Sequence, residues 1–572
     1  MRDLLLGLDP HDIDLVTAED PVSLARNFAD AIKGNFFIMS EEFMTCRVIS
    51  ADGLLNYDFS LRRGEHIVED LRERDFTVNA MAVELPGHGK SAETRGAALL
   101  SPGESAEPVG LELIDPFGGA AHLAGHELVP VEDDIFDRDP LRLLRAVRLE
   151  KQSAMTIGPE LARRILSKSE LASKPSAERT FTELSRVLEA PGCGAGARRL
   201  DELGLLDVLI PELSALKGIT QNEFHHLDVF EHTLAFLDAL DNEIANPESF
   251  FPGMEKKIRE RLERRLAGGI SCRLVLGLAG LFHDIAKPYC RFTDTDGLVR
   301  FFEHDRLGAD MAGEILTRFK ASSESRRAVI QLVRRHMRFE GLIQENEPSD
   351  RARLRYLRAT EPFSQESIML SVSDRLAVRG IRVSEADIEH HLELARSMMA
   401  QAFARDEAVP LPKLTDGEEL MKELKLKPGP LLGKILDQIH EEQQLGQIDT
   451  RDQALLLARA VLEDEAAPPG SPEDDPASTS GSVEDNPDSA SDSPEDDPAA
   501  PAVSVYRIRV LPSGRNDKVV EISDLKGNIL KYVHSRYHLG NSLEHLAPEQ
   551  VKQDLANLSA ENFTRKYRIG DS

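Results

Sequence analysis

Short stretches of alternating or continuous apolar residues mark the first part of this 572-residue chain. A period of two is typical of strands, because successive side chains point to opposite faces. The strand-like stretches are residues 36–39, 46–49, 54–61 and 111–114. Residues 23–33 have helical spacing instead, and the Gly-, Pro-, Ser- and Ala-rich residues 86–110 are predicted to be an inserted loop. Residues 1–125 are therefore predicted to form a mixed α and β domain.

Helical spacing dominates the next part of the chain. Leu141, Leu144 and Val147 illustrate it, since residues three apart lie on one face of a helix. The predicted all-helical segments are residues 126–218, 219–400 and 401–462. The predicted fold class is thus α+β, with a sheet-containing head followed by a long helical part.

The composition changes at residues 463–502, which are rich in Pro, Ser, Asp and Glu. Such a segment buries too little apolar surface to offset its ordering entropy, so we predict a disordered acidic linker. It contains thirteen acidic residues and no Lys or Arg, and without them the net charge would change from −30 to −17. The remainder is still acidic, so any RNA must be bound by local basic patches. Residues 503–572 regain apolar alternation and are predicted to form a small appended domain of unassigned role.

Four widely spaced cysteines argue against a zinc site or a disulfide framework. This usage fits a reducing compartment, and we expect a cytoplasmic protein. No apolar run approaches the roughly 18 residues that a bilayer-spanning helix needs, so no membrane partner is expected. The sequence begins without the apolar core of a signal peptide, and it indicates no particular oligomeric state.

Two carboxylates, Asp12 and Asp14, stand two positions apart in a strand-like stretch. Residues at this spacing point to the same face of a strand, where they could hold Mg²⁺ ions for an in-line displacement at phosphorus. An isolated Asp-x-Asp is more often a solvated strand edge or turn, so the surrounding sequence decides its meaning.

Residues 1–17 (MRDLLLGLDPHDIDLVT) resemble the opening motif of the class II tRNA nucleotidyltransferase and poly(A) polymerase family, with Arg2 and Asp3 in the matching places. The resemblance implies a polymerase-β-like head that uses Mg²⁺, held by Asp12 and Asp14. It also implies that Asp58, on a later strand, supplies the third catalytic carboxylate. The neighbouring Asp52 is the alternative.

Residues 70–82 (DLRERDFTVNAMA) match the family's Arg-Arg-Asp-Phe-Thr-x-Asn-Ala motif. The resemblance implies nucleotide-binding roles for Arg74, Asp75 and Asn79. Residues 137–148 match a later motif, in which Asp139 and Arg142, predicted to share one helix face, would present hydrogen-bonding groups to a C or A base. Two further arginines of that basic face, Arg145 and Arg148, could meet phosphates. Residues 176–213 resemble the family's helical neck.

The sequence departs from the family pattern in three places. The family's strand and Gly-Gly turn precede its Arg-Asp pair, whereas here Arg2 directly follows Met1, and we expect the true gene to begin further upstream. Glu73 replaces the first arginine of the Arg-Arg-Asp motif, and Arg138 replaces a glutamate before Asp139. A P-loop-like ending at residues 87–91 lacks the required upstream glycine, and we do not interpret it as a phosphate-binding loop.

A second group of metal-ligand types follows in the helical part. Its order, His…His-Asp…His…His…Asp on successive helices, resembles the HD phosphohydrolase superfamily. The candidate ligands are His232, His283, Asp284, His304, His336 and Asp374. The resemblance implies a divalent metal of open identity that could activate water against phosphoesters. Lys287 could neutralise phosphate charge, while His225 and His226 have no assigned role.

Three functions remain open at this stage. The first is addition of CMP and AMP, from CTP and ATP, to the 3′ end of tRNA, either as CCA or as A alone. The second is poly(A) addition to an RNA 3′ end. The third is an HD phosphohydrolase or RNA-binding protein with an inactive transferase head.

Overall fold

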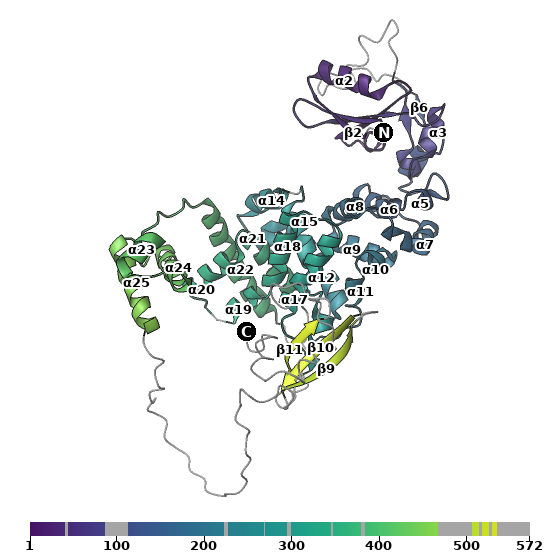
Figure 1. The fold of residues 1–572 in the computed structure, drawn as a ribbon. Helices are drawn as coiled ribbons and strands as arrows, with labels where there is room; N and C mark the ends of the chain where they lie inside the picture. Colours follow the sequence, from purple (N-terminus) through teal and green to yellow (C-terminus); the bar gives the residue numbers. More distant parts are fainter. Residues whose placement is uncertain are drawn as a thin grey trace, which may run out of the picture. The chain divides into compact units, whose positions relative to one another are not determined.

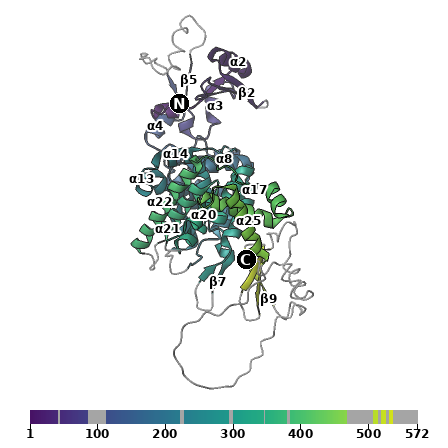
Figure 2. The same cartoon turned by 90° about the vertical axis from the view of Figure 1, so that its left-hand side faces the viewer.

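The computed structural model divides the chain into two compact units. Figures 1 and 2 show the ribbon in two views. The first unit comprises Met1–Ser214 with Ile315–Ser322, and the second comprises Ala215–Glu314 with Ser323–Ser572. The structure describes residues 1–40, 44–85, 112–221, 227–267, 269–293, 299–344, 347–378, 384–466, 506–513, 517–524 and 529–534. The predicted loop 86–110, the P-loop-like residues 87–91, His225, His226 and most of the predicted linker lie outside these ranges.

A four-stranded mixed sheet forms the core of the head, in the order β1-β4-β3-β2. Its strands are β1 (Asp12–Thr17), β2 (Asn35–Ser40), β3 (Thr45–Ile49) and β4 (Asn56–Leu61). Strand β1 runs parallel to β4, and the other neighbours are antiparallel. A separate short pair joins β5 (Ala82–Val83) to β6 (Leu113–Ile114). The mixed α and β head predicted from the apolar pattern is therefore confirmed.

Helix α2 (Pro21–Ile32) packs against one face of this sheet. Asp20 caps it by accepting hydrogen bonds from two backbone N–H groups of the first turn. Ile13 and Leu15 of β1 pack against the core that α2 and the sheet share. Because side chains alternate along a strand, Asp12 and Asp14 lie on the opposite, uncovered face.

The rest of the first unit is mostly helical. Its further elements are α1 (Arg2–Leu5), α3 (Ile67–Arg72), η1 (Thr77–Asn79), α4 (Gly119–Ala124), α5 (Ile135–Arg138), α6 (Arg142–Gln152), α7 (Pro159–Ser167), η3 (Ser169–Ser173), α8 (Ala177–Glu189), α9 (Cys193–Glu202), α10 (Leu205–Leu209) and α11 (Pro211–Ser214). Helix α6 packs against α8 through buried residues such as Leu143, Leu144 and Val147. The polar side of α6 remains available to the head.

The second unit is mostly helical in its described part. Its helices are α12 (Val229–Ala245), α13 (Pro247–Phe250), α14 (Glu255–Glu263), α15 (Cys272–Phe282), α16 (Lys287–Cys290), α17 (His304–Arg318, its last residues counted with the first unit), α18 (Ser323–Arg335), α19 (Arg338–Ile343), α20 (Asp350–Thr360), α21 (Ser364–Ala377) and α22 (Glu385–Glu407). Nearly all of α15 is buried among α12, α18 and α21. The hairpin β7 (Arg291–Thr293) and β8 (Val299–Phe301) follows α16.

Three helices end the helical part and share a small core of their own. They are α23 (Gly417–Leu424), α24 (Pro430–Gln444) and α25 (Arg451–Ala466). The predicted start of the linker at residue 463 is wrong, because α25 continues to Ala466 and the first proline comes only at Pro468. The predicted boundary at residue 400 also falls inside α22, which is one continuous helix.

The described C-terminal residues form a three-stranded antiparallel sheet in the order β11-β10-β9. Its strands are β9 (Tyr506–Ser513), β10 (Asp517–Asp524) and β11 (Ile529–His534). The sheet belongs to the region predicted as an appended domain. Across all described ranges, no helix combines the length and apolar character needed to cross a bilayer.

Candidate active sites

The first candidate site lies on the uncovered face of the head sheet. In the parallel pairing of β1 with β4, Asp12 lies opposite Asn56, and Asp14 lies opposite Asp58. The Asn56 amide donates a hydrogen bond of 2.9 Å to Oδ1 of Asp12. The register therefore brings together the three carboxylates that the sequence predicted, on two adjacent strands.

Asp58 is already paired with a cation of the protein. Arg47, on the neighbouring strand β3, donates from Nε and Nη2 to its two carboxylate oxygens, both at 2.7 Å. This hydrogen bonding, outweighing the effect of burial, raises the pKa of Arg47 further above its ordinary value. The bidentate pair fixes the orientation of Asp58 beside Asp14.

The alternative third carboxylate, Asp52, serves a turn. It accepts hydrogen bonds from Ser50 Oγ at 2.5 Å and from the backbone N–H of Leu54 at 3.0 Å. The hydrogen bond from Ser50, followed by that from Leu54, lowers the pKa of Asp52. The cleft described next is lined by Asp58 and not by Asp52. The geometry favours Asp58 as the companion of Asp12 and Asp14.

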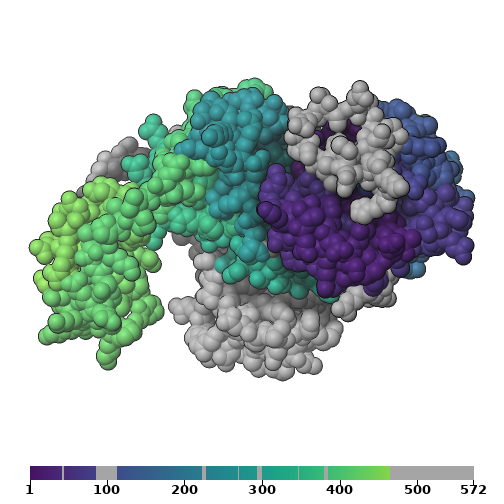
Figure 3. Space-filling view, turned by 90° about the horizontal axis from the view of Figure 1, so that it is seen from above, coloured from purple at the N-terminus to yellow at the C-terminus, as the bar shows by residue number. Residues whose placement is uncertain are grey.

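A cleft of about 2380 Å³ runs along this face within the first unit. On the head side it is lined by Asp12, Asp14 and Asp58. The other charged residues named from the sequence also line it: Arg2, Asp3, Arg74, Asp75, Asp139, Arg142, Arg145 and Arg148. In the space-filling view, the purple head and the blue segment that follows it form adjoining surfaces (Figure 3). The cleft is thus lined by the three head carboxylates and by a row of arginines on α6, Arg142, Arg145 and Arg148.

Asp75 is buried and bound on both oxygens by protein donors. One oxygen accepts from the backbone N–H of Phe76 at 2.8 Å and from Asn79 at 3.0 Å, and the other accepts from Arg145 Nε at 2.7 Å. Burial alone would raise the pKa of Asp75, but Arg145 and these hydrogen bonds hold it below its ordinary value. Asp75 therefore positions Arg145 and Asn79, and direct contact of Asp75 with a nucleotide stays a prediction.

The remaining residues of the two N-terminal motifs are also joined by hydrogen bonds and ion pairs. Arg2 donates to Asn79 Oδ1 at 3.0 Å and to Asp3 Oδ1 at 2.7 Å. Arg74 Nη2 lies 3.3 Å from Asp70 Oδ2, one turn earlier. The opening motif and the Arg-Asp motif, far apart in sequence, thus meet through Arg2 and Asn79.

Asp139 and Arg142 do not share a helix face as predicted. Asp139 has an extended backbone (φ −140°, ψ 98°) and ends α5, while α6 begins only at Arg142. The reason is Pro140, since a residue before proline is sterically disfavoured in the helical region. Asp139 Oδ1 accepts from the backbone N–H of Leu141 at 3.2 Å, and Oδ2 accepts from Arg179 at 3.1 Å. Both predicted base-reading residues nevertheless line the cleft.

Arg142 is oriented by the head and keeps one nitrogen without a hydrogen-bond acceptor. Its Nη2 donates to the backbone carbonyl of Glu73 at 2.5 Å. Its Nη1 is buried and has no hydrogen-bond partner among the described residues. Burial lowers the pKa of Arg142, although Asp75 and Asp139 oppose this effect. The Glu73 carbonyl thus fixes the orientation of the guanidinium, and Nη1 is left without an acceptor among the described residues.

A buried glutamate that sequence reasoning missed organises the arginine row. Glu183 on α8 lies 3.0 Å from Arg148 Nε, 3.3 Å from Arg186 Nη1 and 4.0 Å from Arg145 Nη1. Burial lowers the pKa of Arg148 to about 10, with Glu183 acting in the opposite sense. The available signal was a charged residue on the apolar face of α8, beside the buried Leu184 and Val187.

The two substitutions that depart from the family pattern lie against each other. Arg138 Nη1 is 3.3 Å from Glu73 Oε1, and Arg138 also pairs with Asp134. At these two positions the family pattern has an arginine and a glutamate in the opposite order. In this chain the two departures therefore form an ion pair with each other.

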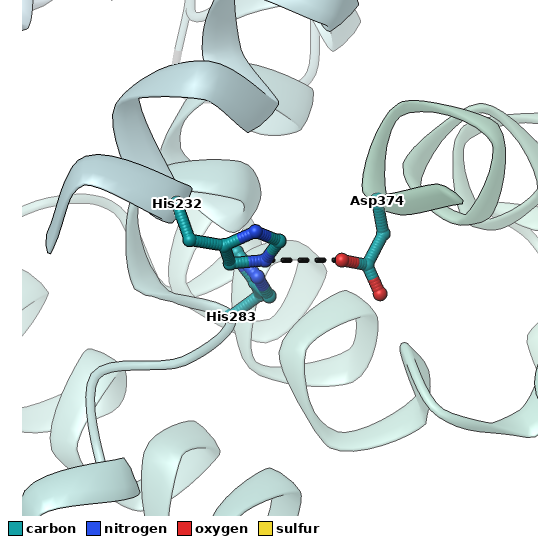
Figure 4. A group of neighbouring side chains, drawn as sticks. All are labelled: His232, His283 and Asp374. Atoms are coloured by element: carbon teal, nitrogen blue, oxygen red, sulfur yellow. Dashed lines mark ion pairs between the residues drawn. The ribbon is translucent and has the colours of Figure 1, made fainter. Parts of the chain in front are cut away.

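The second candidate site lies inside the second unit, where five helical segments converge. His232 lies on α12, His283 and Asp284 follow α15, His304 begins α17, His336 follows α18, and Asp374 lies on α21. These residues form two groups whose ligand atoms lie within 4.8 Å of one another: His232, His283 and Asp374, and Asp284, His304 and His336. Figure 4 shows the first group, with His232 Nε2 at 3.1 Å from Asp374 Oδ1. The structure thus brings together all six predicted ligands.

Backbone carbonyls orient the imidazoles toward the centre. Nδ1 of His283, His304 and His336 lies 2.7, 2.6 and 2.7 Å from the carbonyls of Gly280, Phe301 and Val333, respectively. A carbonyl can only accept, so each Nδ1 donates to it. Whenever the ring is neutral, its Nε2 then presents the lone pair that a metal ligand requires. Burial lowers the pKa of His336 to about 3, so its ring is neutral near pH 7.

Asp284 connects the two groups. Its Oδ2 lies 3.1 Å from His283 Nε2 and 3.6 Å from His232 Nε2, while its Oδ1 lies 3.5 Å from His304 Nε2. His283 Nε2 and Asp284 Oδ2 are buried without hydrogen-bond geometry between them. Clustered lone pairs of this kind fit a divalent cation, and the two faces of Asp284 could serve two of them.

Lys287 is the cation that the protein itself places at this cluster. Its Nζ lies 2.7 Å from Asp284 Oδ2 and donates to Gln221 Oε1 at 2.7 Å. Burial opposes ionisation of Asp284, yet His283 and Lys287 hold its pKa well below the ordinary value. Gln221 escaped the sequence interpretation because no motif includes it.

Comparison with known proteins covers most of the chain. Family models match residues 1–126 (Poly A polymerase head domain), 154–217 (Probable RNA and SrmB- binding site of polymerase A), 258–379 (HD domain) and 391–458 (tRNA nucleotidyltransferase domain 2 putative). The A-adding tRNA nucleotidyltransferase of Deinococcus radiodurans is 31% identical over 479 residues, which cover 82% of this chain and 95% of that protein. The CC-adding tRNA nucleotidyltransferase of Thermus thermophilus is 30% identical over 489 residues, covering 83% and 95%.

A solved structure, the Thermotoga maritima CCA-adding enzyme complexed with tRNA, matches with 20% identity and a TM-score of 0.47 over 81% of this chain and 89% of that one. The Deinococcus and Thermus proteins are more similar to this chain in sequence, and each is matched over nearly its whole length. Together with the head and HD-domain matches, they establish what the chain is. It belongs to the class II tRNA nucleotidyltransferase and poly(A) polymerase family, as a tRNA nucleotidyltransferase enzyme that also carries an HD domain.

Proposed function

We propose that this enzyme adds C or A residues to the 3′ end of tRNA, in the cleft of the first unit, with Asp12, Asp14 and Asp58 as the catalytic carboxylates. The observation that carries the proposal is the β1–β4 register, which aligns Asp14 with Asp58 at the cleft. Carboxylate oxygens are the ligands that Mg²⁺ prefers. Bound there, Mg²⁺ would activate the 3′-hydroxyl and stabilise the leaving pyrophosphate.

The protein's own residues would select the base. Asp139 and Arg142 both line the cleft, so Asp139 can accept a hydrogen bond from an exocyclic amine, and the Arg142 guanidinium can donate to a ring acceptor. Cytosine and adenine offer this pair of groups, whereas uracil lacks the amine. CTP and ATP are therefore the proposed nucleotide substrates, in agreement with the names of the CC-adding and A-adding relatives.

The size and charge of the cleft support a nucleotide together with an RNA end. Its volume of about 2380 Å³ exceeds the roughly 300–1,000 Å³ of a site for one small ligand. Arg179 and Arg186 on α8 line it and are about half exposed. Both lie in the segment that matches an RNA-binding family model. Of the two, Arg186 is the proposed contact to RNA, as part of the local basic surface that a chain of net charge −30 needs for RNA binding.

The full chain with Mg²⁺ and labelled CTP or ATP tests this function on tRNA transcripts that end before, within or after CCA. Addition of A only after CC would make it an A-adding enzyme, and addition of two C residues a CC-adding one. Addition of all three residues would make it a CCA-adding enzyme, and long A tracts would overturn the tRNA-end specificity. No addition to any transcript would contradict the proposal.

A second proposed activity is metal-dependent phosphoester hydrolysis at the HD cluster. The supporting observation is the convergence of six ligands, with three Nε2 lone pairs directed inward by backbone carbonyls. A bound metal would lower the pKa of a water that attacks phosphorus. Lys287 would neutralise charge on the phosphate. The 2′,3′-cyclic phosphate of a nucleoside is the proposed substrate, whose hydrolysis breaks one ring P–O bond and leaves a phosphomonoester.

Hydrolysis of 2′,3′-cyclic AMP by the full chain, with Mg²⁺, Mn²⁺, Ni²⁺ or Co²⁺ supplied in turn, tests this activity. His304→Ala removes one inward-directed nitrogen and is expected to abolish hydrolysis. The matched control is His440→Ala, because His440 lies on α24 in the separate helical core. Absence of turnover with every metal would contradict the second activity and leave the first unaffected.

A further inference from the structure

We propose that Arg179 is a positioning residue for base selection, whose guanidinium holds the Asp139 carboxylate in the orientation that accepts an exocyclic amine. The inference rests on the proposed role of Asp139 in base reading. Arg179 does not belong to the motif of Asp139 and Arg142. It reaches the site only through the tertiary fold, across 40 residues of sequence.

The contacts of Asp139 show how it would be held. Its Oδ1 accepts from the backbone N–H of Leu141 at 3.2 Å, and its Oδ2 accepts from Arg179 Nη2 at 3.1 Å. These are the hydrogen bonds that the described part of the chain makes to this carboxylate. Each carboxylate oxygen has two lone pairs. Oδ2 can therefore receive a base amine while Arg179 still fixes the plane of the carboxylate.

The position of Arg179 is not explained by the stability of its own helix. It is the third residue of α8, whose first turn is capped by Ser176. Backbone N–H groups make this end of a helix positive, so a cation there is unfavourable. The Asp139–Arg179 pair is also well exposed, at 32% and 58%, and such pairs add little to stability. Its place in the cleft lining, in contrast, puts the side chain where it can act on a bound nucleotide through Asp139.

The effect on selection follows from the fixed geometry. A uracil or hypoxanthine base presents a carbonyl oxygen where cytosine or adenine presents an amine, and that oxygen would meet Oδ2 lone pair to lone pair. A fixed carboxylate cannot relieve this repulsion. Without Arg179, Asp139 could turn away. The amine would then lose its hydrogen-bond acceptor, and the carbonyl oxygen would no longer be repelled by Oδ2 of Asp139.

The test compares nucleotides in which a carbonyl replaces the exocyclic amine and the neighbouring ring nitrogen changes from an acceptor to an N–H donor. The pairs are CTP against UTP for a CC- or CCA-adding enzyme, and ATP against ITP for an A-adding one. kcat and KM are measured for wild type, Arg179→Ala, Arg179→Lys and Asp139→Asn on one tRNA. Arg179→Ala is expected to lower the amine-over-carbonyl ratio of kcat/KM by about tenfold, the value of a charged hydrogen bond, mainly through the KM of the amine nucleotide. Arg179→Lys should recover part of the ratio.

Arg163→Ala is the matched control, because Arg163 is an exposed arginine on α7 that pairs with Glu160 and does not line the cleft. It is expected to leave the ratio unchanged. Should Arg179→Ala fail to fold, Arg179→Gln and Arg179→Lys decide by the same ratio.

Three results would overturn the inference in distinguishable ways. An unchanged ratio in Arg179→Ala, with a collapsed ratio in Asp139→Asn, would remove the role of Arg179 alone. An unchanged ratio in both would remove base reading by Asp139 as well. An equal loss for both nucleotides together with a raised KM for tRNA would assign Arg179 to RNA binding instead.

Discussion

The two candidate sites of this enzyme assemble carboxylates in opposite ways. In the head, Asp12 and Asp14 are exposed, and Asp58 is balanced by Arg47 of the same sheet. In the HD domain, Asp284 is buried beside inward-directed imidazoles. Each set includes one carboxylate paired with a protein cation, Asp58 with Arg47 and Asp284 with Lys287. The second set is shielded from water, however, and leaves the buried Nε2 of His283 without a hydrogen-bond partner among the described residues. The head therefore carries an open site and the HD domain a closed one.

The two sites also differ in the secondary-structure elements that carry their residues. The open site is built from period-two spacing on adjacent strands, so its carboxylates follow from local sequence and register. The closed site draws its ligands from helical segments scattered over more than 140 residues of sequence, from His232 to Asp374. Loss of one ligand should therefore disturb the packing of the closed site more than that of the open site.

The largest expected effect is at the open site. Asp12→Asn combined with Asp14→Asn should reduce nucleotide addition by at least about a thousandfold, since metal stabilisation of the transition state contributes several kcal/mol. Unfolding temperature and HD-domain hydrolysis should be unchanged, because the two carboxylates are exposed in the other unit. Single-turnover addition and a thermal melt measure both quantities. Substantial residual transfer would show that these carboxylates do not hold the catalytic metal.

A pH effect on stability is expected in the second unit, at His391. His391 on α22 is buried, and its Nε2 lies 2.9 Å from Ser371 Oγ. Burial, assisted by Arg375, lowers its pKa to about 4. As the pH falls, His391 is therefore protonated in the unfolded chain before it is protonated in the folded chain. The stability that depends on a neutral His391 is fully present above about pH 6.5 and is lost as the pH falls towards 4.

The loss should reach about 3 kcal/mol, at 1.36 kcal/mol per pKa unit. Urea unfolding of the second unit between pH 7 and pH 4 measures it, and His391→Gln should flatten the slope. An equally steep slope in His391→Gln would assign the acid sensitivity to other groups, the histidines of the HD cluster first.

A smaller effect is expected from exchanging the charges of the Glu73–Arg138 ion pair. Glu73→Arg alone would place two cations together near the backbone carbonyl that orients Arg142. The double variant Glu73→Arg with Arg138→Glu should restore the attraction in the order of the family pattern. The coupling free energy should be only about 0.5–1 kcal/mol, because both side chains are partly exposed. A double-mutant cycle on the KM of the nucleotide measures it, and strict additivity would show that the pair is incidental.

The smallest effect is expected at Asp52. Asp52→Asn keeps an oxygen acceptor for the turn, so nucleotide addition should change by less than about twofold, and the melting temperature should change little. Asp58→Asn, in the same assay, should abolish addition. The reverse ranking would make Asp52 the third catalytic carboxylate and contradict the role given to the β1–β4 register.

Much of the head and the membership of the HD cluster could be predicted from the sequence. The alternation in β1 places Asp12 and Asp14 on one face, and local propensity is sufficient for that prediction. The order of His and Asp residues similarly predicted the six members of the HD cluster. Where local chemistry was overlooked, prediction failed: Pro140 ends the helix that was expected to carry Asp139, and α25 extends past residue 463.

The sequence by itself therefore determined the family, the strand-borne carboxylates and the ligand inventory, because these depend on neighbours in the chain. Only the tertiary structure decided how Arg47 balances Asp58, how Asp75 is enclosed by Arg145, and how Arg179 reaches Asp139. It also decided that backbone carbonyls direct the imidazoles inward. Such contacts depend on how whole helices and strands pack against one another. The order of charges along the chain does not specify which oppositely charged side chains that packing brings into contact.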